Sequence, residues 1–71
     1  MQNLKQLRVS RSYTPEEVGA YVGKSRKSIE DYENGFAHRM SFHTAVLMAE
    51  MYEIPVEDLA KTVFPSHQEN K

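Results

Sequence analysis

The 71-residue sequence contains no cysteine and no tryptophan. Without cysteine, neither a disulfide nor a thiolate metal site can add to the stability of a small hydrophobic core. No apolar run approaches the roughly 20 residues that cross a bilayer, and residues 1–5 lack the apolar stretch of a secretion signal. These absences predict a small, soluble, cytoplasmic protein with one domain over residues 1–64 and a flexible tail over residues 65–71.

The chain also lacks the strong positive charge that is usual in nucleic-acid-binding proteins. Nine Lys and Arg against ten Asp and Glu leave a net charge of −1. The charge is polarised, because residues 1–40 hold seven basic and five acidic side chains, whereas residues 41–71 hold two basic and five acidic ones. Since counterion release supplies much of the affinity for DNA, any DNA binding by a lone monomer is expected to be modest.

The histidines and carboxylates do not form a pattern that indicates chemistry. His38 and His43 are five residues apart across a loop-to-helix boundary, and His67 lies in the tail. This is not the spacing of a zinc site, and no cysteine completes one. No nucleophile and base are paired, and no carboxylates cluster as a catalytic pair would. We expect no catalytic residue, no metal, no cofactor and no small-molecule ligand.

Glycine, proline and helix-capping residues divide the chain into five short helices. The first is expected over about residues 2–11. The second has a strong start, with Thr14 as N-cap, Pro15 at the first helical position and Glu17 completing a capping box. Gly23 is placed to end it in the left-handed conformation.

The remaining three helices follow similar signals. Ser25 caps a third helix that is expected to run to Asn34, and residues 36–40 are expected to form a loop. Ser41 caps a fourth helix, and residues 56–62 form a short fifth one. The fourth helix carries a wide apolar stripe, made of Phe42, Ala45, Val46, Met48, Ala49 and Tyr52. With no convincing strand, the pattern predicts an all-α fold.

Residues 14–35 form a compact helix pair, two helices of about nine residues joined by the turn Gly23-Lys24. Such a pair can project the N-terminal end of its second helix into a major groove while the first helix lies across it. That end reads Ser25-Arg26-Lys27-Ser28, so free backbone N–H groups and two cations lie together. This combination suits contacts with phosphates and base edges.

The sequence resembles the Xre/Cro/CI-like helix-turn-helix DNA-binding domains of phage repressors and bacterial regulators. The resemblance covers about residues 3–60 in a single register. It is carried by residues 4–8 (LKQLR), 13–19 (YTPEEVG), 22–29 (VGKSRKSI), 32–35 (YENG) and 54–59 (IPVEDL). It implies a compact five-helix, lambda-repressor-like fold with the helix-turn-helix at helices two and three.

The resemblance also implies a role for individual residues, with the third helix as the recognition helix. Base-edge contacts fall on Arg26, Lys27 and Asp31, and phosphate contacts fall on Ser25, Ser28, His38 and Arg39. Arg8 and Glu33 match a pair that forms a buried salt bridge between helices one and three. The side chains agree with these roles, because Arg and Lys favour guanine O6 and N7, and an Asp can accept from cytosine N4.

The sequence departs from the family pattern at several positions on this surface. Pro15 replaces a glutamine that often contacts a phosphate, and Gly19 replaces the usual alanine, at a cost of roughly 0.5–1 kcal/mol of helix stability. Glu30 and Asp31 bring negative charge to the recognition helix at i,i+4 from Arg26 and Lys27. A solvated helix end is the alternative interpretation for the two cations, and a local ion pair is the alternative for Asp31.

Several apolar residues fall where relatives commonly have polar ones. They are Tyr21, Phe36, Leu47, Met51, Val63 and Phe64. Leu47 and Met51 are i,i+4 neighbours on one face of the fourth helix. We interpret Leu47, Met51, Val63 and Phe64 as a candidate protein interface, since contiguous exposed apolar patches usually bind a partner. The alternative is that they thicken the core of a small domain.

Two functions fit the sequence. The first is a sequence-specific transcriptional repressor that binds double-stranded operator DNA as a homodimer built from helices four and five, and acts by occlusion. The second is a phage-type modulator or antirepressor of a lysogeny switch, which binds another repressor protein in a heteromeric complex and binds DNA weakly or not at all by itself. Near-neutral charge, Pro15, Glu30 and Asp31 favour the second function.

Overall fold

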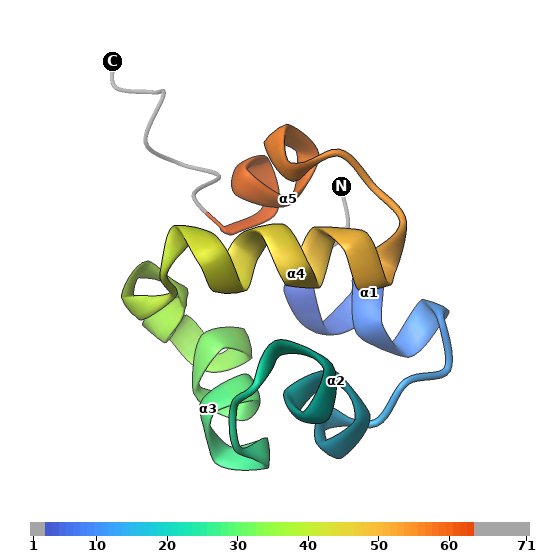
Figure 1. The fold of residues 1–71 in the computed structure, drawn as a ribbon, viewed down its shortest axis with the longest axis vertical. Helices are drawn as coiled ribbons and strands as arrows, with labels where there is room; N and C mark the ends of the chain where they lie inside the picture. Colours follow the sequence, from blue (N-terminus) through green and yellow to red (C-terminus); the bar gives the residue numbers. More distant parts are fainter. Residues whose placement is uncertain (1–2, 64–71) are drawn as a thin grey trace.

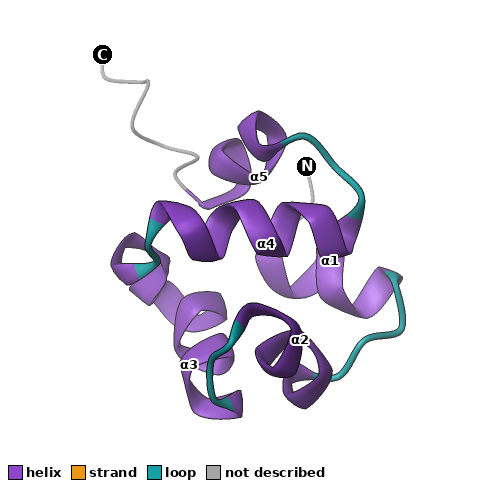
Figure 2. Cartoon of the chain, in the orientation of Figure 1, coloured by secondary structure: helices purple, strands orange, loops and turns teal. Residues whose placement is uncertain are grey.

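The computed structural model describes residues 3–63, and within that range the chain is helical without any strand (Figures 1 and 2). Five α-helices are present: α1 (Leu4–Ser10), α2 (Pro15–Val22), α3 (Arg26–Asp31), α4 (Phe42–Tyr52) and α5 (Val56–Val63). A π-helical turn at Tyr32–Phe36 and a 3₁₀ turn at Ala37–Arg39 connect α3 to α4. The all-α, five-helix prediction is confirmed.

The helix starts follow the capping residues of the sequence. Thr14 accepts a hydrogen bond from the Glu17 N–H and donates its own N–H to the Glu17 carboxylate, so the predicted capping box is present. A second capping box, which joins Asn3 and Gln6, starts α1 at Leu4 rather than near residue 2. Side-chain caps therefore satisfy free N–H groups at the first turns of both helices.

The α-helical hydrogen-bond pattern of α3 ends at Asp31, but helical backbone angles continue until Asn34, where the sequence predicts the end of the helix. The chain continues through a wider turn in which Asn34 leaves the helical region and Gly35 adopts a φ of +115°. This left-handed conformation favours glycine and ends the helical segment. Residues 36–40, expected as a loop, contain the 3₁₀ turn of residues 37–39.

The core lies around α4, which crosses the middle of the molecule with α5 on one side and α2 on the other (Figure 1). The fully buried side chains of the core come from every helix except α1. They are Val18, Ile29, Thr44, Met48, Tyr52 and Leu59. Phe42 differs from the predicted apolar stripe, because its side chain is 76% exposed. It occupies the first helical position after the Ser41 cap, and the buried stripe begins further along α4.

A buried ion pair joins α1 to the turn that follows α3. Arg8 Nε and Nη2 donate to the two carboxylate oxygens of Glu33 at 2.6 and 3.1 Å, and the two side chains are 10% and 4% exposed. Arg8 Nη1 also donates to the carbonyl of Tyr13, at 3.0 Å. Hydrogen bonding to Glu33 raises the pKa of Arg8 above its already high usual value, so the guanidinium stays charged. The structure therefore shows the Arg8–Glu33 contact that the resemblance implies.

None of the helices in residues 3–63 has the length and apolar character needed to span a membrane.

Replacing Glu33 by Ala is expected to lower the free energy of unfolding by about 3–5 kcal/mol, because it leaves the Arg8 guanidinium buried without its counter-charge. Thermal unfolding followed by circular dichroism measures the change. Glu57→Ala, which removes an exposed carboxylate from α5, is the control and should change stability by less than about 0.5 kcal/mol. An unchanged melting temperature in Glu33→Ala would show that the pair does not hold the fold.

Candidate nucleic-acid interface

The turn between α2 and α3 approaches the backbone of α2 closely at Gly19. The carbonyl oxygen of Gly19 accepts hydrogen bonds from the N–H groups of Gly23 and Lys24, the latter at 2.8 Å. A Cβ on Gly19 would lie 2.5 Å from the carbonyl oxygen of Lys24, inside van der Waals contact. Gly23 ends α2 with a φ of +77°, the left-handed exit predicted for it. Glycine at 19 thus lets the turn fold directly onto α2.

Ser25 and Ser28 form the start of α3. The Ser25 hydroxyl caps the helix by accepting from the Ser28 N–H at 3.1 Å, and the two hydroxyls lie 3.2 Å apart. Ser25 is exposed and Ser28 is half-buried. The side chains of Arg26 and Lys27, which follow Ser25 in the first turn, are exposed.

The two cations of α3 are exposed and each is paired with a carboxylate of the same surface. The Arg26 side chain is 60% exposed, with Nε 3.0 Å from Glu30 and Nη1 3.4 Å from Glu16 on α2. Lys27 is 83% exposed and its Nζ lies 3.5 Å from Asp31. Exposed pairs of this kind contribute about 0–1 kcal/mol each, so a competing anion can displace them.

Asp31 lies one turn beyond Lys27, in the place that the resemblance gives to a base contact. Its side chain is 40% exposed and belongs to the Lys27 pair. The local ion pair is therefore present in the structure, and a base contact by Asp31 would require that pair to open.

His38 and Arg39 lie in the 3₁₀ turn of residues 37–39, and both are exposed. The Arg39 guanidinium stacks over the ring of Phe36, with 4.7 Å between its Cζ atom and the ring centroid. The turn comes two residues after the positive-φ Gly35, so these side chains lie near the C-terminal end of α3 and not with Arg26 and Lys27.

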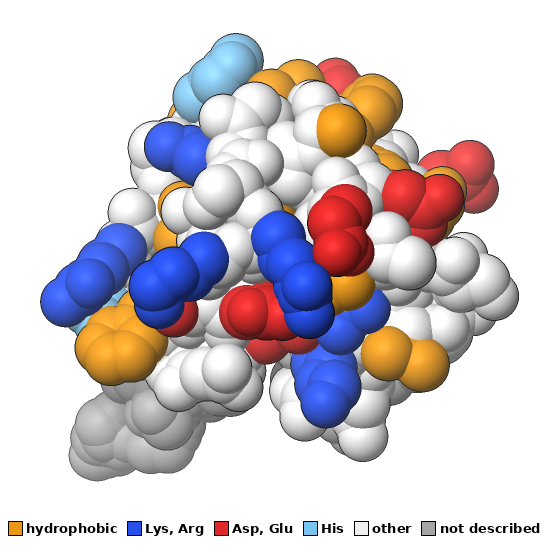
Figure 3. Space-filling model, turned by 90° about the horizontal axis from the view of Figure 1, so that it is seen from below, with side chains coloured by type: hydrophobic (Ala, Val, Ile, Leu, Met, Phe, Trp, Pro, Cys, Tyr) orange, Lys and Arg blue, Asp and Glu red, His pale blue; other side chains and the backbone are white. Residues whose placement is uncertain are grey.

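Figure 3 shows the face of the molecule on the side of α2 and α3. Lys and Arg side chains form a band across this face, and Asp and Glu side chains lie between them. The face is thus basic in outline and partly neutralised by its own carboxylates, in keeping with the small charge of residues 1–40. No group of three or more potential metal ligands gathers within residues 3–63.

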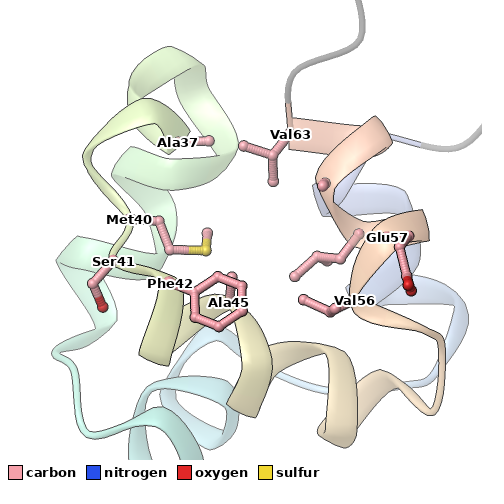
Figure 4. A pocket seen from close by; sticks show the side chains of 10 residues that line it. Ala37, Met40, Ser41, Phe42, Ala45, Val56, Glu57 and Val63 are labelled. Carbon is pink, nitrogen blue, oxygen red and sulfur yellow. The ribbon is translucent and has the colours of Figure 1, made fainter.

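The candidate protein interface is only partly assembled in the structure. Leu47 and Met51 are half-buried and pack against the core, as does Val63. Phe64, the fourth residue of this set, lies outside the described residues. An apolar surface that is more exposed than Leu47 and Met51 lies nearby. It is a groove of about 380 Å³ between the start of α4 and α5. Met40 and Phe42 face Val56 and Val63 across it (Figure 4).

Three features of this surface were not apparent from the sequence. Glu16 reaches Arg26 from the neighbouring helix, Arg39 stacks on Phe36, and Gly19 is required by the approach of the turn. The first two depend on the three-dimensional meeting of separate elements. The glycine carried a signal, since it is unusual inside a helix and often marks a close backbone approach.

The comparisons with known proteins agree with this geometry. A helix-turn-helix family model matches residues 4–59, which span all five helix starts and the whole α2–α3 pair. The chain belongs to the Xre/Cro/CI-type helix-turn-helix family, a family of DNA-binding transcription regulators. Neither the curated proteins nor the solved structures return a match.

Replacing Gly19 by Val is expected to destabilise the domain by about 1–3 kcal/mol, because the added side chain must push the Lys24 carbonyl away. The matched control is Ala20→Val at the next position of the same helix, which is exposed. Chemical denaturation measures both variants. Equal stability of the two variants would show that the turn accommodates a side chain at Gly19.

Proposed function

We propose that this protein is a Cro/CI-like transcriptional repressor that reads operator DNA in the major groove with α3. The observation that carries the proposal is the position of Arg26 and Lys27, exposed in the first turn of α3. The absence of a side chain at Gly19 lets the chain just before this turn lie against α2. Guanidinium and ammonium groups in this position suit bidentate or single contacts with guanine O6 and N7.

The other proposed DNA contacts come from residues near the two ends of α3. Ser25 and Ser28 would donate to phosphates beside the groove, together with free N–H groups at the start of α3. His38 and Arg39 would contact phosphates near the other end of α3. Asp31 would accept from a cytosine N4 when Lys27 leaves it for the DNA. Glu16 and Glu30 would lower the overall affinity, since their charge opposes that of the phosphates.

A homodimer formed through α4 and α5 completes the proposed repressor. Phe42, 76% exposed, lies at the edge of an apolar groove that it helps to line. In a two-fold symmetric pair, the Phe42 ring of each copy would enter the groove of the other, with Val63 beside it. Leu47 and Met51 are half-buried against the core and do not line this groove, so they would contribute little to this contact. Two recognition helices would then face successive major grooves, and the modest contacts of each monomer would add.

A second function is favoured by the apolar groove between α4 and α5 and by the ion pairs that Arg26 and Lys27 form within the protein. The α4–α5 groove would bind another repressor protein instead of a second copy, and the chain would act as an antirepressor with weak DNA binding of its own. The two functions predict different behaviour of the isolated protein toward duplex DNA.

Simultaneous replacement of Arg26 and Lys27 by Ala is expected to abolish sequence-specific binding, because each direct base contact contributes about 1–3 kcal/mol of discrimination. The operator is first selected from a library of random duplexes with the parent protein. Fluorescence anisotropy then compares the affinities for that operator and for a scrambled duplex.

The matched control is Lys5→Ala with Lys61→Ala, which removes the same charge from exposed positions on α1 and α5. This control variant should bind both duplexes more weakly by the same factor and keep the preference for the operator. A parent protein that binds no duplex at about 50 mM salt would exclude the simple repressor and favour the antirepressor. An Arg26, Lys27 double variant that kept the preference would show that another surface reads the DNA.

For the dimer, Phe42→Glu is expected to convert the protein to a monomer without loss of helicity, because the side chain is exposed in the single chain. Analytical ultracentrifugation measures the mass of the protein in solution, and circular dichroism measures its helicity. Val9→Glu is the control, since Val9 is 55% exposed and does not line the groove. A parent that sediments as a monomer at every concentration would exclude the homodimer.

A further inference from the structure

The Phe36 ring is a large apolar side chain that is 42% exposed on the turn after α3. It is not part of the buried core cluster. The Arg39 guanidinium carbon lies 4.7 Å from its centroid, well within the roughly 6 Å at which a cation is attracted to the face of an aromatic ring. The exposed ring thus has two defined neighbours. They are the Arg39 guanidinium and the His38 ring, whose centroid lies farther away, at 6.1 Å, in a tilted arrangement.

Arg39 differs from the two cations of α3 in the partners of its side chain. The donors of Arg26 and Lys27 are engaged by the carboxylates of Glu16, Glu30 and Asp31. Within residues 3–63, the Arg39 side chain makes neither an ion pair nor a hydrogen bond. Contact with an external anion therefore requires no internal pair of Arg39 to open.

Stacking holds a guanidinium through its face and leaves the N–H donors at its edge. An arginine has five such donors in a planar fork, which fits the oxygens of a phosphate. The ring also restricts the long side chain before any ligand arrives. Less conformational freedom is then lost when the contact forms.

We propose that Phe36 is a positioning residue, which holds the Arg39 guanidinium in place for a phosphate of the DNA backbone beside the C-terminal end of α3. A phosphate is favoured over a base edge because the 37–39 turn lies at the opposite end of α3 from Arg26. The inference rests on the proposed DNA binding and extends it to a residue that makes no DNA contact itself.

A double-mutant cycle on duplex binding tests this role. The variants are Phe36→Leu, which keeps an apolar side chain but has no aromatic face, Arg39→Ala, and the two together. Anisotropy with the selected operator and with a scrambled duplex gives each affinity as a function of salt. Phe36→Leu is expected to weaken binding to both duplexes by about two- to fivefold. Arg39→Ala is expected to weaken it further and to reduce the salt slope by about 0.9.

The cycle separates the possible roles of the ring. If Phe36 acts through Arg39, Phe36→Leu has no additional effect when Arg39 is already Ala. An equal loss in both backgrounds would show that the ring contacts DNA directly, and no loss in either would leave it without a positioning role. Both results would overturn the proposal. Phe36→Tyr retains the aromatic face and is expected to bind like the parent.

The free protein supplies a readout that does not depend on DNA. Ring current from Phe36 should shift the Arg39 Hδ proton resonances upfield, and Phe36→Leu should remove this shift while the melting temperature stays near that of the parent. Phe36→Met serves as a second variant without an aromatic face if Phe36→Leu proves unstable. Unshifted Arg39 resonances in the parent would overturn the stacked geometry.

Failure of this inference and failure of the proposed function are distinguishable. A parent that binds duplex DNA, together with a Phe36→Leu variant that binds equally well, defeats only the positioning role. A parent that binds neither duplex at about 50 mM salt defeats the proposed function, and the positioning role falls with it.

Discussion

The Arg8 guanidinium connects three parts of the chain through one buried set of hydrogen bonds. It binds both carboxylate oxygens of Glu33 and the carbonyl of Tyr13, so α1, the segment before α2 and the turn after α3 share one buried group. A domain of this size buries a limited apolar area, and directional contacts of this kind select one arrangement of its helices. The proposed reading helix, α3, directly precedes the turn in which Glu33 binds Arg8.

On that surface, positive charge and its neutralisation come from the same two helices. Arg26 and Lys27 are close enough to three carboxylates for each cation to be paired in the absence of DNA. These pairs are exposed, so their free energy is small beside that of a good base contact. Their larger effect is on non-specific affinity, which depends on net charge near the phosphates. A protein with this surface would discriminate between sequences through geometry more than through a strong overall attraction to DNA.

The sequence predicted those parts of the structure that depend on local chemistry. The structure confirms the helix ends that were predicted from capping residues, proline and glycine, because these residues act on the backbone within a few positions. The residues concerned are Thr14, Pro15, Glu17, Gly23 and Ser41. Helical backbone angles end at Asn34, as predicted, but the change from α-helical to π-helical hydrogen bonding after Asp31 has no signal in the residue pattern. The pairing of Arg26 with Glu16 and the exposure of Phe42 depend on where other elements lie, and residue spacing carries no such information.

The residues of the proposed recognition surface were named from the sequence, whereas most contacts among them were not. The Arg8–Glu33 pair was accessible through the family register alone, because its members are 25 positions apart. The stacking of Arg39 on Phe36 had no sequence signal beyond two residues of suitable type. Phe36 had been grouped with apolar residues suited to a protein interface, and only the geometry shows that a cation covers its ring.

The backbone contact at Gly19 separates the packing of α3 on α2 from the identity of the residues that we propose to read DNA. The close approach of the turn to α2 involves main-chain atoms of Gly19, Gly23 and Lys24. The side chains of Arg26 and Lys27 contribute nothing to that contact. Under the proposed function, substitutions at these two positions would change which bases are preferred while this backbone contact is kept, although replacing Arg26 would also remove its exposed ion pair with Glu16 of α2. The domain would then be a suitable scaffold for engineering new operator specificities.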